Sequence, residues 1–382
     1  EGTISMSGER QPRFEASSPL LTVKLVPPIQ ASRSLPRTDI VDRLVEADGQ
    51  VRLITAPAGW GKTTLLAAWL EAEDGGRPVA YLRLEDGDDS APVFWTYVVA
   101  ALRRAHPDLA AEAERALRNP EVDPMREVVP SLLNELTDVA EPPLLVMDDY
   151  HAISQDDIHR SVDYFIDHLP PGVQLAIATR ADPRLGLGRL RARDSLLELR
   201  AHDLAFSVAE TGELLQQRFA VSLDDTGVEL LRDRTEGWPA AVHLAGMSLQ
   251  DTHDPNGFVA RFAGDDRNVA DFLMGEALAK VPDRDREFLL RTSLLDQMTG
   301  SLCNAVAGVT DGAETLDRLE QHGLFLIPLD NTRSWYRYHR LFGDWLRHEL
   351  RRTDSALIPT IHLAAARWYT ETGSLEPAVD HA

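Results

Sequence analysis

Short apolar runs recur through the first half of the chain, separated by segments with helical spacing. Five of these runs have the length and near-continuous apolar character of strands that are buried on both faces: residues 51–55, 79–84, 144–147, 173–178 and 196–199. Helices are predicted between the strands, among them helices near residues 91–105 and 125–139. Strands that alternate with helices predict a parallel sheet with helices on both sides.

Helical spacing dominates residues 207–281, with no further strand-like run. Ser207 and Glu210 have the spacing of a capping box at the start of this region. Further helices are predicted near residues 268–280 and 283–293. The pattern therefore predicts an all-α domain after the sheet.

The end of the chain shows two more patterns. Apolar residues 324–329, the polar turn 330–334 and residues 335–339 predict a β-hairpin. A hairpin with helices before and after it is typical of a winged helix. Residues 364–382 predict a helix pair broken at 372–374, and a single pair cannot bury its own apolar face. We therefore expect this pair to begin a helical repeat array.

These patterns divide the chain into five predicted segments: a flexible leader or tag at 1–20, an α/β domain at 21–205, a helical domain at 206–280, a winged-helix domain at 281–355, and the start of TPR-like repeats at 356–382.

Composition narrows the possible classes of function. The 382 residues carry a formal net charge of −22, which disfavours a nucleic-acid-binding surface on this chain. The single cysteine, Cys303, excludes an internal disulfide and favours a reducing compartment. No apolar run approaches the roughly 20 residues of a membrane span, and no apolar signal core begins the chain. We therefore predict a cytoplasmic protein.

The junction between the first strand and its helix has the pattern of a phosphate-binding loop. Gly59 and Gly61 let the backbone wrap a polyphosphate, and the new helix presents free N–H groups to the same anion. Lys62 would reach the β- and γ-phosphates, and the Thr63 hydroxyl would ligate Mg²⁺. Because Ala56 stands where the strict pattern has a glycine, a surface turn before a helix is the alternative. The predicted contacts to ATP or ADP are Ala56, Pro57, Ala58, Gly59, Trp60, Gly61, Lys62, Thr63 and Thr64.

A second motif lies at the end of the strand at 144–147. Asp148 and Asp149 follow this buried run, and ligands bind outside the carboxyl ends of parallel strands. Asp148 would hold Mg²⁺ through water, and Asp149 would orient or deprotonate an attacking water. A helix-capping pair is the alternative.

Four further positions are candidates for nucleotide contact or catalysis. Arg180 ends the next strand at the same edge, where it would sense the γ-phosphate or remain a surface arginine. The turn at 237–239 would place a ring against adenine or simply join two helices. His339 would contact a diphosphate from the winged domain or serve a structural role. Arg37 and Pro239 complete the predicted nucleotide contacts, and Lys62 and Arg180 join Asp149 as predicted catalytic residues.

In this order, these segments resemble the nucleotide-binding module of MalT-like regulators, the ATP-dependent LuxR-type activators of the STAND class. The resemblance covers roughly residues 21–382 and depends on five segments: 56–64, 146–151, 178–183, 236–240 and 338–342. It implies a bacterial P-loop NTPase that is a slow ATPase and acts as a switch. In such proteins the winged domain closes over ADP at rest. An inducer binds the C-terminal repeats, ATP replaces ADP, the protein self-associates, and a C-terminal helix-turn-helix binds promoters.

Two other functions fit the residues. A STAND switch can have a non-transcriptional output, such as defence or a fused signalling enzyme. A housekeeping P-loop enzyme with rapid turnover would need a substrate pocket that no motif here suggests, and the helical and winged domains would then have no role. The completed repeat array and the helix-turn-helix are not in this sequence, so we expect the chain to be part of a longer protein.

Overall fold

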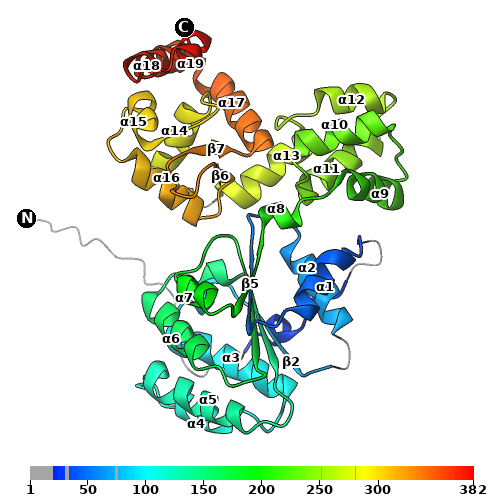
Figure 1. Cartoon of the computed structure of the whole chain (residues 1–382), viewed down its shortest axis with the longest axis vertical. Helices are drawn as coiled ribbons and strands as arrows, with labels where there is room; N and C mark the ends of the chain where they lie inside the picture. Colours follow the sequence, from blue (N-terminus) through cyan, green and yellow to red (C-terminus); the bar gives the residue numbers. More distant parts are fainter. Residues whose placement is uncertain (1–19, 31–33, 74–75, 251, 280) are drawn as a thin grey trace, which may run out of the picture.

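A five-stranded parallel sheet forms the centre of the lower body in Figure 1. The computed structural model describes residues 20–30, 34–73, 76–250, 252–279 and 281–382, so the predicted leader lies almost wholly outside the described residues. The strands lie in the order β2-β3-β4-β1-β5, and every neighbouring pair is parallel. The strands are β1 (Val51–Thr55), β2 (Val79–Arg83), β3 (Leu144–Asp148), β4 (Gln174–Thr179) and β5 (Leu196–Arg200). All five coincide with the predicted apolar runs to within one residue.

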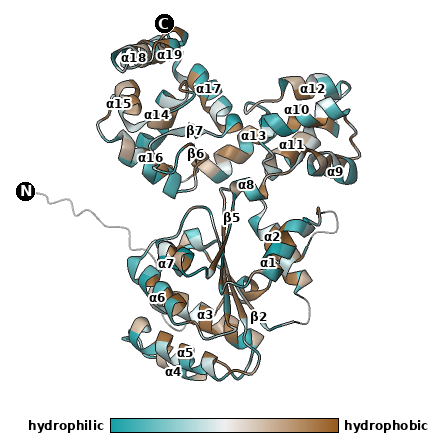
Figure 2. Cartoon of the chain, viewed as in Figure 1, coloured by the Kyte–Doolittle hydropathy of each residue, from teal (hydrophilic) through white to brown (hydrophobic). Residues whose placement is uncertain are grey.

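The two faces of the sheet pack into two different cores. Ile54 and Val146 face the core on the α1 and α2 side, whereas Leu53 and Leu145 face the core that contains α3, α5 and α6. This alternation follows from the period of two along a strand, and it explains why these strands carry apolar residues on both faces. Figure 2 shows the result as hydrophobic strands between helices whose outer faces are hydrophilic.

Seven helices flank the sheet in the described part of this domain: α1 (Thr38–Glu46), α2 (Lys62–Ala72), α3 (Ala91–Ala105), α4 (Ala111–Leu117), α5 (Val129–Thr137), α6 (Asp156–Asp167) and α7 (Leu187–Ala192). The helix predicted near 125–139 is two elements, a π-helical turn η3 (Pro124–Val128) followed by α5. Pro130 lacks the N–H that would continue the α-helical ladder across this junction. The sequence analysis did not single out α4, although its alanine-rich run favours a helix.

A helical domain follows the sheet through the short helix α8 (Ala201–Leu204). Its elements are α9 (Val208–Phe219), α10 (Asp225–Thr235), α11 (Pro239–Gln250), α12 (Pro255–Arg261), α13 (Arg267–Phe272) and the π-helical turn η5 (Leu273–Leu278). The predicted capping box is present, because Ser207 Oγ accepts from the Glu210 N–H and the Glu210 carboxylate accepts from the Ser207 N–H.

The predicted hairpin forms within a second helical group. Its strands β6 (Leu326–Pro328) and β7 (Tyr336–Tyr338) are antiparallel, and the Asp330 carboxylate accepts from the Ser334 N–H within the turn. Four helices surround the hairpin: α14 (Asp283–Thr292), α15 (Gly300–Ala307), α16 (Gly312–Gln321) and α17 (Arg340–Asp354). The core on the α1 and α2 side continues through the helical domain into this group, so the parts of the chain share buried apolar surface.

The last two helices form the predicted pair, α18 (Ile358–Glu371) and α19 (Leu375–Asp380), with Gly373 in the left-handed conformation between them. Leu363, Leu375 and Val379 on this pair are exposed. Among the described residues, no helix has both the length and the apolar character that crossing a bilayer requires.

Candidate functional site

The loop between β1 and α2 has the backbone of a phosphate-binding loop. Gly59 and Gly61 have φ angles of 75° and 77°, which side-chain-bearing residues rarely adopt. Lys62 is 7% exposed, and its ammonium donates to the carbonyl oxygens of Ala56 at 2.7 Å and Pro57 at 3.0 Å. Burial, and then the charge of Arg180, lowers the pKa of Lys62 to about 8, against the opposing effect of Asp149 and Asp148. A buried ammonium that is hydrogen-bonded to two neutral carbonyl oxygens is well suited to bind an anion.

Thr63 and Asp148, the two predicted metal ligands, are hydrogen-bonded to each other. The Thr63 hydroxyl donates to Asp148 Oδ2 at 2.9 Å, and the Tyr81 hydroxyl donates to the same oxygen at 2.9 Å. Asp148 is fully buried, and its burial and the neighbouring Asp149 carboxylate raise its pKa. A divalent cation at this point would favour the ionised carboxylate. Tyr81 was not predicted, although its strand ends at the same edge of the sheet.

Asp149 occupies a different environment from Asp148. Its φ angle is 57°, and its carboxylate accepts from Arg83 Nε at 3.2 Å, with His151 Nδ1 at 3.9 Å. Arg83 ends β2, so its position at this edge was a signal that the sequence analysis left unused. The structure therefore separates the two carboxylates into a buried, hydroxyl-bonded group and a partly exposed group paired with a cation.

A cavity of about 300 Å³ lies beside the loop and the start of α2. The predicted contacts Arg37 and Pro239 line it, together with apolar residues that include Leu35 and Phe206. Four predicted contacts of the loop and α2 also line it: Gly59, Trp60, Gly61 and Thr64. The Arg37 guanidinium lies over the Phe206 ring, ion-pairs with Glu210 at 2.7 Å and donates to the Leu204 carbonyl at 2.9 Å. A mostly apolar cavity next to a phosphate loop fits a nucleobase and its sugar.

The helical domain holds the phosphate loop through two hydrogen bonds. Trp238 Nε1 donates to the Ala58 carbonyl at 3.1 Å, and the Ala240 N–H donates to the Gly59 carbonyl at 3.1 Å. A Cβ on Gly59 would lie 2.6 Å from the Ala240 Cβ, so this approach also requires glycine. The Trp238 ring is fully buried against the loop and the winged domain, which assigns the turn at 237–239 to domain contact, while Pro239 lines the cavity.

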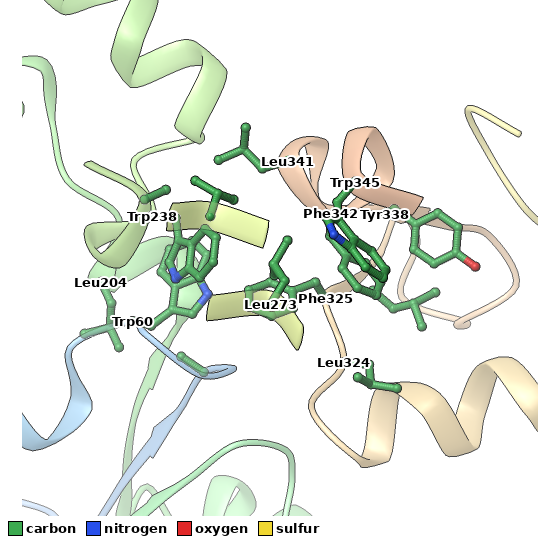
Figure 3. Close-up of a cluster of buried hydrophobic side chains, with 14 of the residues drawn as sticks. Trp60, Leu204, Trp238, Leu273, Leu324, Phe325, Tyr338, Leu341, Phe342 and Trp345 are labelled. Carbon is green, nitrogen blue, oxygen red and sulfur yellow. The ribbon is translucent and has the colours of Figure 1, made fainter. Parts of the chain in front are cut away.

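His339 lies within a group of aromatic rings at the junction of all three domains. Its ring centroid is 5.5 Å from Trp238, 5.9 Å from Phe325 and 6.1 Å from Trp60 of the loop, and Figure 3 shows those three partners within the buried cluster. His339 is 1% exposed, and burial lowers its pKa to about 4, although the Glu236 charge and a nearby Thr235 backbone group act to raise it. Neither ring nitrogen has a hydrogen-bond partner of standard geometry among the described residues.

Ion pairs connect the domains near this cluster, among them three that involve arginines of the sheet domain or the hairpin. Arg337 of β7 forms a bidentate pair with Glu236 at 2.8 and 2.9 Å. The other two pairs are Arg180 with Glu276 at 3.1 Å and Arg333 with Asp182 at 3.4 Å. The acidic partners were not predicted, because they lie far from the arginines in sequence.

The residues at this edge fit a nucleoside di- or triphosphate with a divalent cation. The buried Lys62 ammonium, the Thr63–Asp148 pair and the positive-φ glycines supply the groups that phosphate and Mg²⁺ require. Trp60 Nε1 has no hydrogen-bond partner among the described residues, and the His339 nitrogens have none of standard geometry there, so a bound polar ligand could supply partners to both. No cluster of three or more His, Cys, Asp or Glu side chains suited to a metal occurs in the described ranges.

Comparison with known proteins also indicates a P-loop NTPase with a winged helix domain. Residues 274–358 match the family model of the MalT winged helix domain. The chain is 33% identical over 366 residues to the HTH-type transcriptional regulator MalT of Klebsiella pneumoniae, which covers 95% of this chain and 40% of that protein. A Walker-type ATPase of Pyrococcus abyssi has a similar fold, with a TM-score of 0.56, 16% identity, and coverage of 85% of this chain and 99% of that chain.

The chain is therefore a MalT-like P-loop NTPase module that includes a winged helix domain, and the predicted fold class is confirmed. It spans about 40% of the length of the curated relative that it matches. The boundaries of the five predicted segments and the roles of the individual site residues stay predictions.

Proposed function

We propose that this chain is the ATP/ADP-binding switch module of a bacterial, cytoplasmic transcription regulator. The proposal rests on two hydrogen bonds from the helical domain to the phosphate loop. Trp238 Nε1 donates to the Ala58 carbonyl, and the Ala240 N–H donates to the Gly59 carbonyl. Because the same loop would hold the phosphates, a change in the bound nucleotide would act directly on the contacts between domains. The identity to a transcriptional regulator over 95% of the chain favours transcription as the output over defence or a fused enzyme.

Each site residue has a proposed role in this switch. Lys62 binds phosphate oxygens, and Thr63 and Asp148 hold Mg²⁺. The Asp149 carboxylate accepts a proton from the water that attacks the γ-phosphate, and the module hydrolyses ATP slowly. When bound, Mg-ATP supplies the γ-phosphoryl group and its cleavable bond. The cavity that Arg37 and Pro239 line accepts the base and sugar of the nucleotide.

The arrangement seen here is the closed, ADP-type form in this proposal. The winged domain contacts the loop through His339 and Trp60, and His339 is our candidate for its contact with the terminal phosphate of ADP. A ligand shifts such an equilibrium only through its different affinity for the two forms. ATP would favour an open form that self-associates. An inducer would bind a repeat array that continues from α18 and α19, and a C-terminal helix-turn-helix would bind DNA.

Replacing Lys62 with alanine tests nucleotide binding. A charge-assisted hydrogen bond contributes about 1.5–3 kcal/mol, so Lys62→Ala should weaken both ATP and ADP by at least about tenfold. Calorimetric titration of both nucleotides with Mg²⁺ is the measurement. Arg104→Ala, which removes an exposed cation from α3, is the matched control and should bind as the wild type does. Equal affinities for wild type and Lys62→Ala would refute the proposal.

Replacing Asp149 with asparagine tests whether Asp149 serves hydrolysis while Asp148 serves Mg²⁺ binding. Asparagine keeps the shape and loses the base, so ATP should bind within about threefold of wild type while hydrolysis slows about a hundredfold. Single-turnover hydrolysis beside a binding curve measures both quantities. Asp156→Asn removes another carboxylate that is paired with an arginine, Arg184, and should leave both unchanged. Hydrolysis by Asp149→Asn at the wild-type rate would exclude a catalytic role.

A further inference from the structure

Arg180 leaves the sheet next to the phosphate loop. It follows β4, whose last residue Thr179 pairs in register with Thr55 at the end of β1, immediately before the loop. The Arg180 charge is close enough to Lys62 to lower the pKa of that ammonium. Arg180 is therefore placed to add a second positive charge to whatever the loop binds.

The helical domain already binds this guanidinium. Arg180 Nη1 donates to the Glu276 carbonyl at 3.0 Å, and Nη2 donates to the Glu276 carboxylate at 3.1 Å. Glu276 lies in η5, which is π-helical, and π-helical turns recur at functional sites. Two bonds to one residue fix the direction of the guanidinium as well as neutralising it.

The winged domain also approaches the same arginine closely. Gly323, with φ of 65°, follows α16, and a Cβ at this position would lie 2.7 Å from the Arg180 Cβ and 3.0 Å from its carbonyl oxygen. Only glycine permits this approach. The helical and winged domains thus both contact Arg180, and Glu276 of the helical domain pairs with its charge.

We propose that Glu276 sets the preference of the site between ADP and ATP by competing with the γ-phosphate for Arg180. This inference rests on the proposed function and assigns it a discriminating residue. ADP has no γ-phosphate, so it binds without disturbing the Arg180–Glu276 pair. The γ-phosphate of ATP contacts Arg180 only after that pair breaks. The free energy of breaking the pair therefore lowers the affinity for ATP and leaves the affinity for ADP unchanged. Glu276 acts through Arg180 and is a positioning residue.

A double-mutant cycle tests the proposal. The variants are Glu276→Gln, Arg180→Gln and the double variant, and the quantity is the ratio of ATP to ADP affinity with Mg²⁺, measured by calorimetry with a slowly hydrolysed ATP analogue. Arg180 and Glu276 are 27% and 50% exposed, so the pair is modest, and Glu276→Gln should raise the ratio about 2- to 5-fold. In the Arg180→Gln background the same change should leave the ratio unaltered.

Two controls separate charge from structure. Glu276→Asp keeps the charge and should retain a ratio close to wild type. Asp271→Asn removes the carboxylate of an exposed pair with Arg267 in the adjacent helix α13, and should have no effect. An unchanged ratio in Glu276→Gln, or a change that persists without Arg180, would overturn the inference. A wild-type chain that binds neither nucleotide would instead contradict the proposed function itself.

Discussion

Replacing Trp238 with alanine is expected to lower the free energy of unfolding by about 3–5 kcal/mol and to release the phosphate loop from the helical domain. The indole is fully buried, with ring contacts to Phe272 at 5.5 Å and Phe325 at 4.8 Å. Its Nε1 donor satisfies the Ala58 carbonyl. Alanine would leave a cavity where three domains meet and an unpaired carbonyl in the loop.

Urea unfolding and nucleotide titration of the same variants measure the two consequences. Trp238→Phe keeps most of the ring and loses the hydrogen bond, so it should cost less stability while still weakening the coupling between loop and domain. Trp335→Ala removes a half-buried tryptophan from the hairpin turn and should cost clearly less than Trp238→Ala. A loss below about 1 kcal/mol for Trp238→Ala, with nucleotide affinity unchanged, would show that the indole does not hold the domains together.

Some of the backbone strain lies at ion pairs between distant parts of the chain, and some, at Ala110, Asp194 and Ala220, lies elsewhere. Arg37, Asp149, Glu236 and Arg333 all have φ between 46° and 57°, a conformation that costs a non-glycine residue about 1–2 kcal/mol. Each makes an ion pair with a residue distant in sequence, and the partners are Glu210, Arg83, Arg337 and Asp182. An exposed ion pair contributes only about 0.2–1 kcal/mol, so these pairs alone do not offset the strain. The surrounding packing must hold these residues, as expected where position serves a site or a domain contact.

The sequence predicted the sheet and the loop because both depend on local signals. A strand buried on both faces must be apolar throughout, and a phosphate loop needs Gly59, Gly61 and Lys62 at fixed spacing. The residues of the other domains that contact the site have no such local signal in the sequence. Glu276 lies 96 residues after Arg180, and its sequence reads as part of an ordinary helix. The sequence left two interpretations of the Trp238 turn open, a ring against adenine or a simple turn between helices, and it gave no signal for the contact that the indole makes with the Ala58 carbonyl.

The sequence also left open two roles for His339, and its burial makes them separable by pH. The pKa of His339 is about 4 in the folded chain and about 6.5 when exposed, so the folded state holds the neutral imidazole. Between these values the unfolded chain binds the additional proton. The stability that His339 contributes is therefore complete above pH 6.5 and is lost as the pH falls toward 4, at about 1.4 kcal/mol per pH unit.

From pH 6.5 to pH 5 the wild type should therefore lose about 2 kcal/mol more stability than His339→Phe, which has no proton to bind. Urea unfolding at each pH measures the difference, and His322→Phe, which removes an exposed histidine, should keep the wild-type dependence. Glu236 and Asp344 act to raise the pKa of His339 and Arg337 acts to lower it, while the pKa of Glu236 is itself lowered, so its own titration lies below this window. Parallel curves for wild type and His339→Phe would show that the imidazole is not held neutral. Saturating ADP distinguishes the two roles, because a phosphate in contact with the imidazole favours its protonated form and should flatten the wild-type curve. A wild-type curve that ADP leaves equally steep would assign His339 to the structure of the domain junction, with another group contacting the nucleotide.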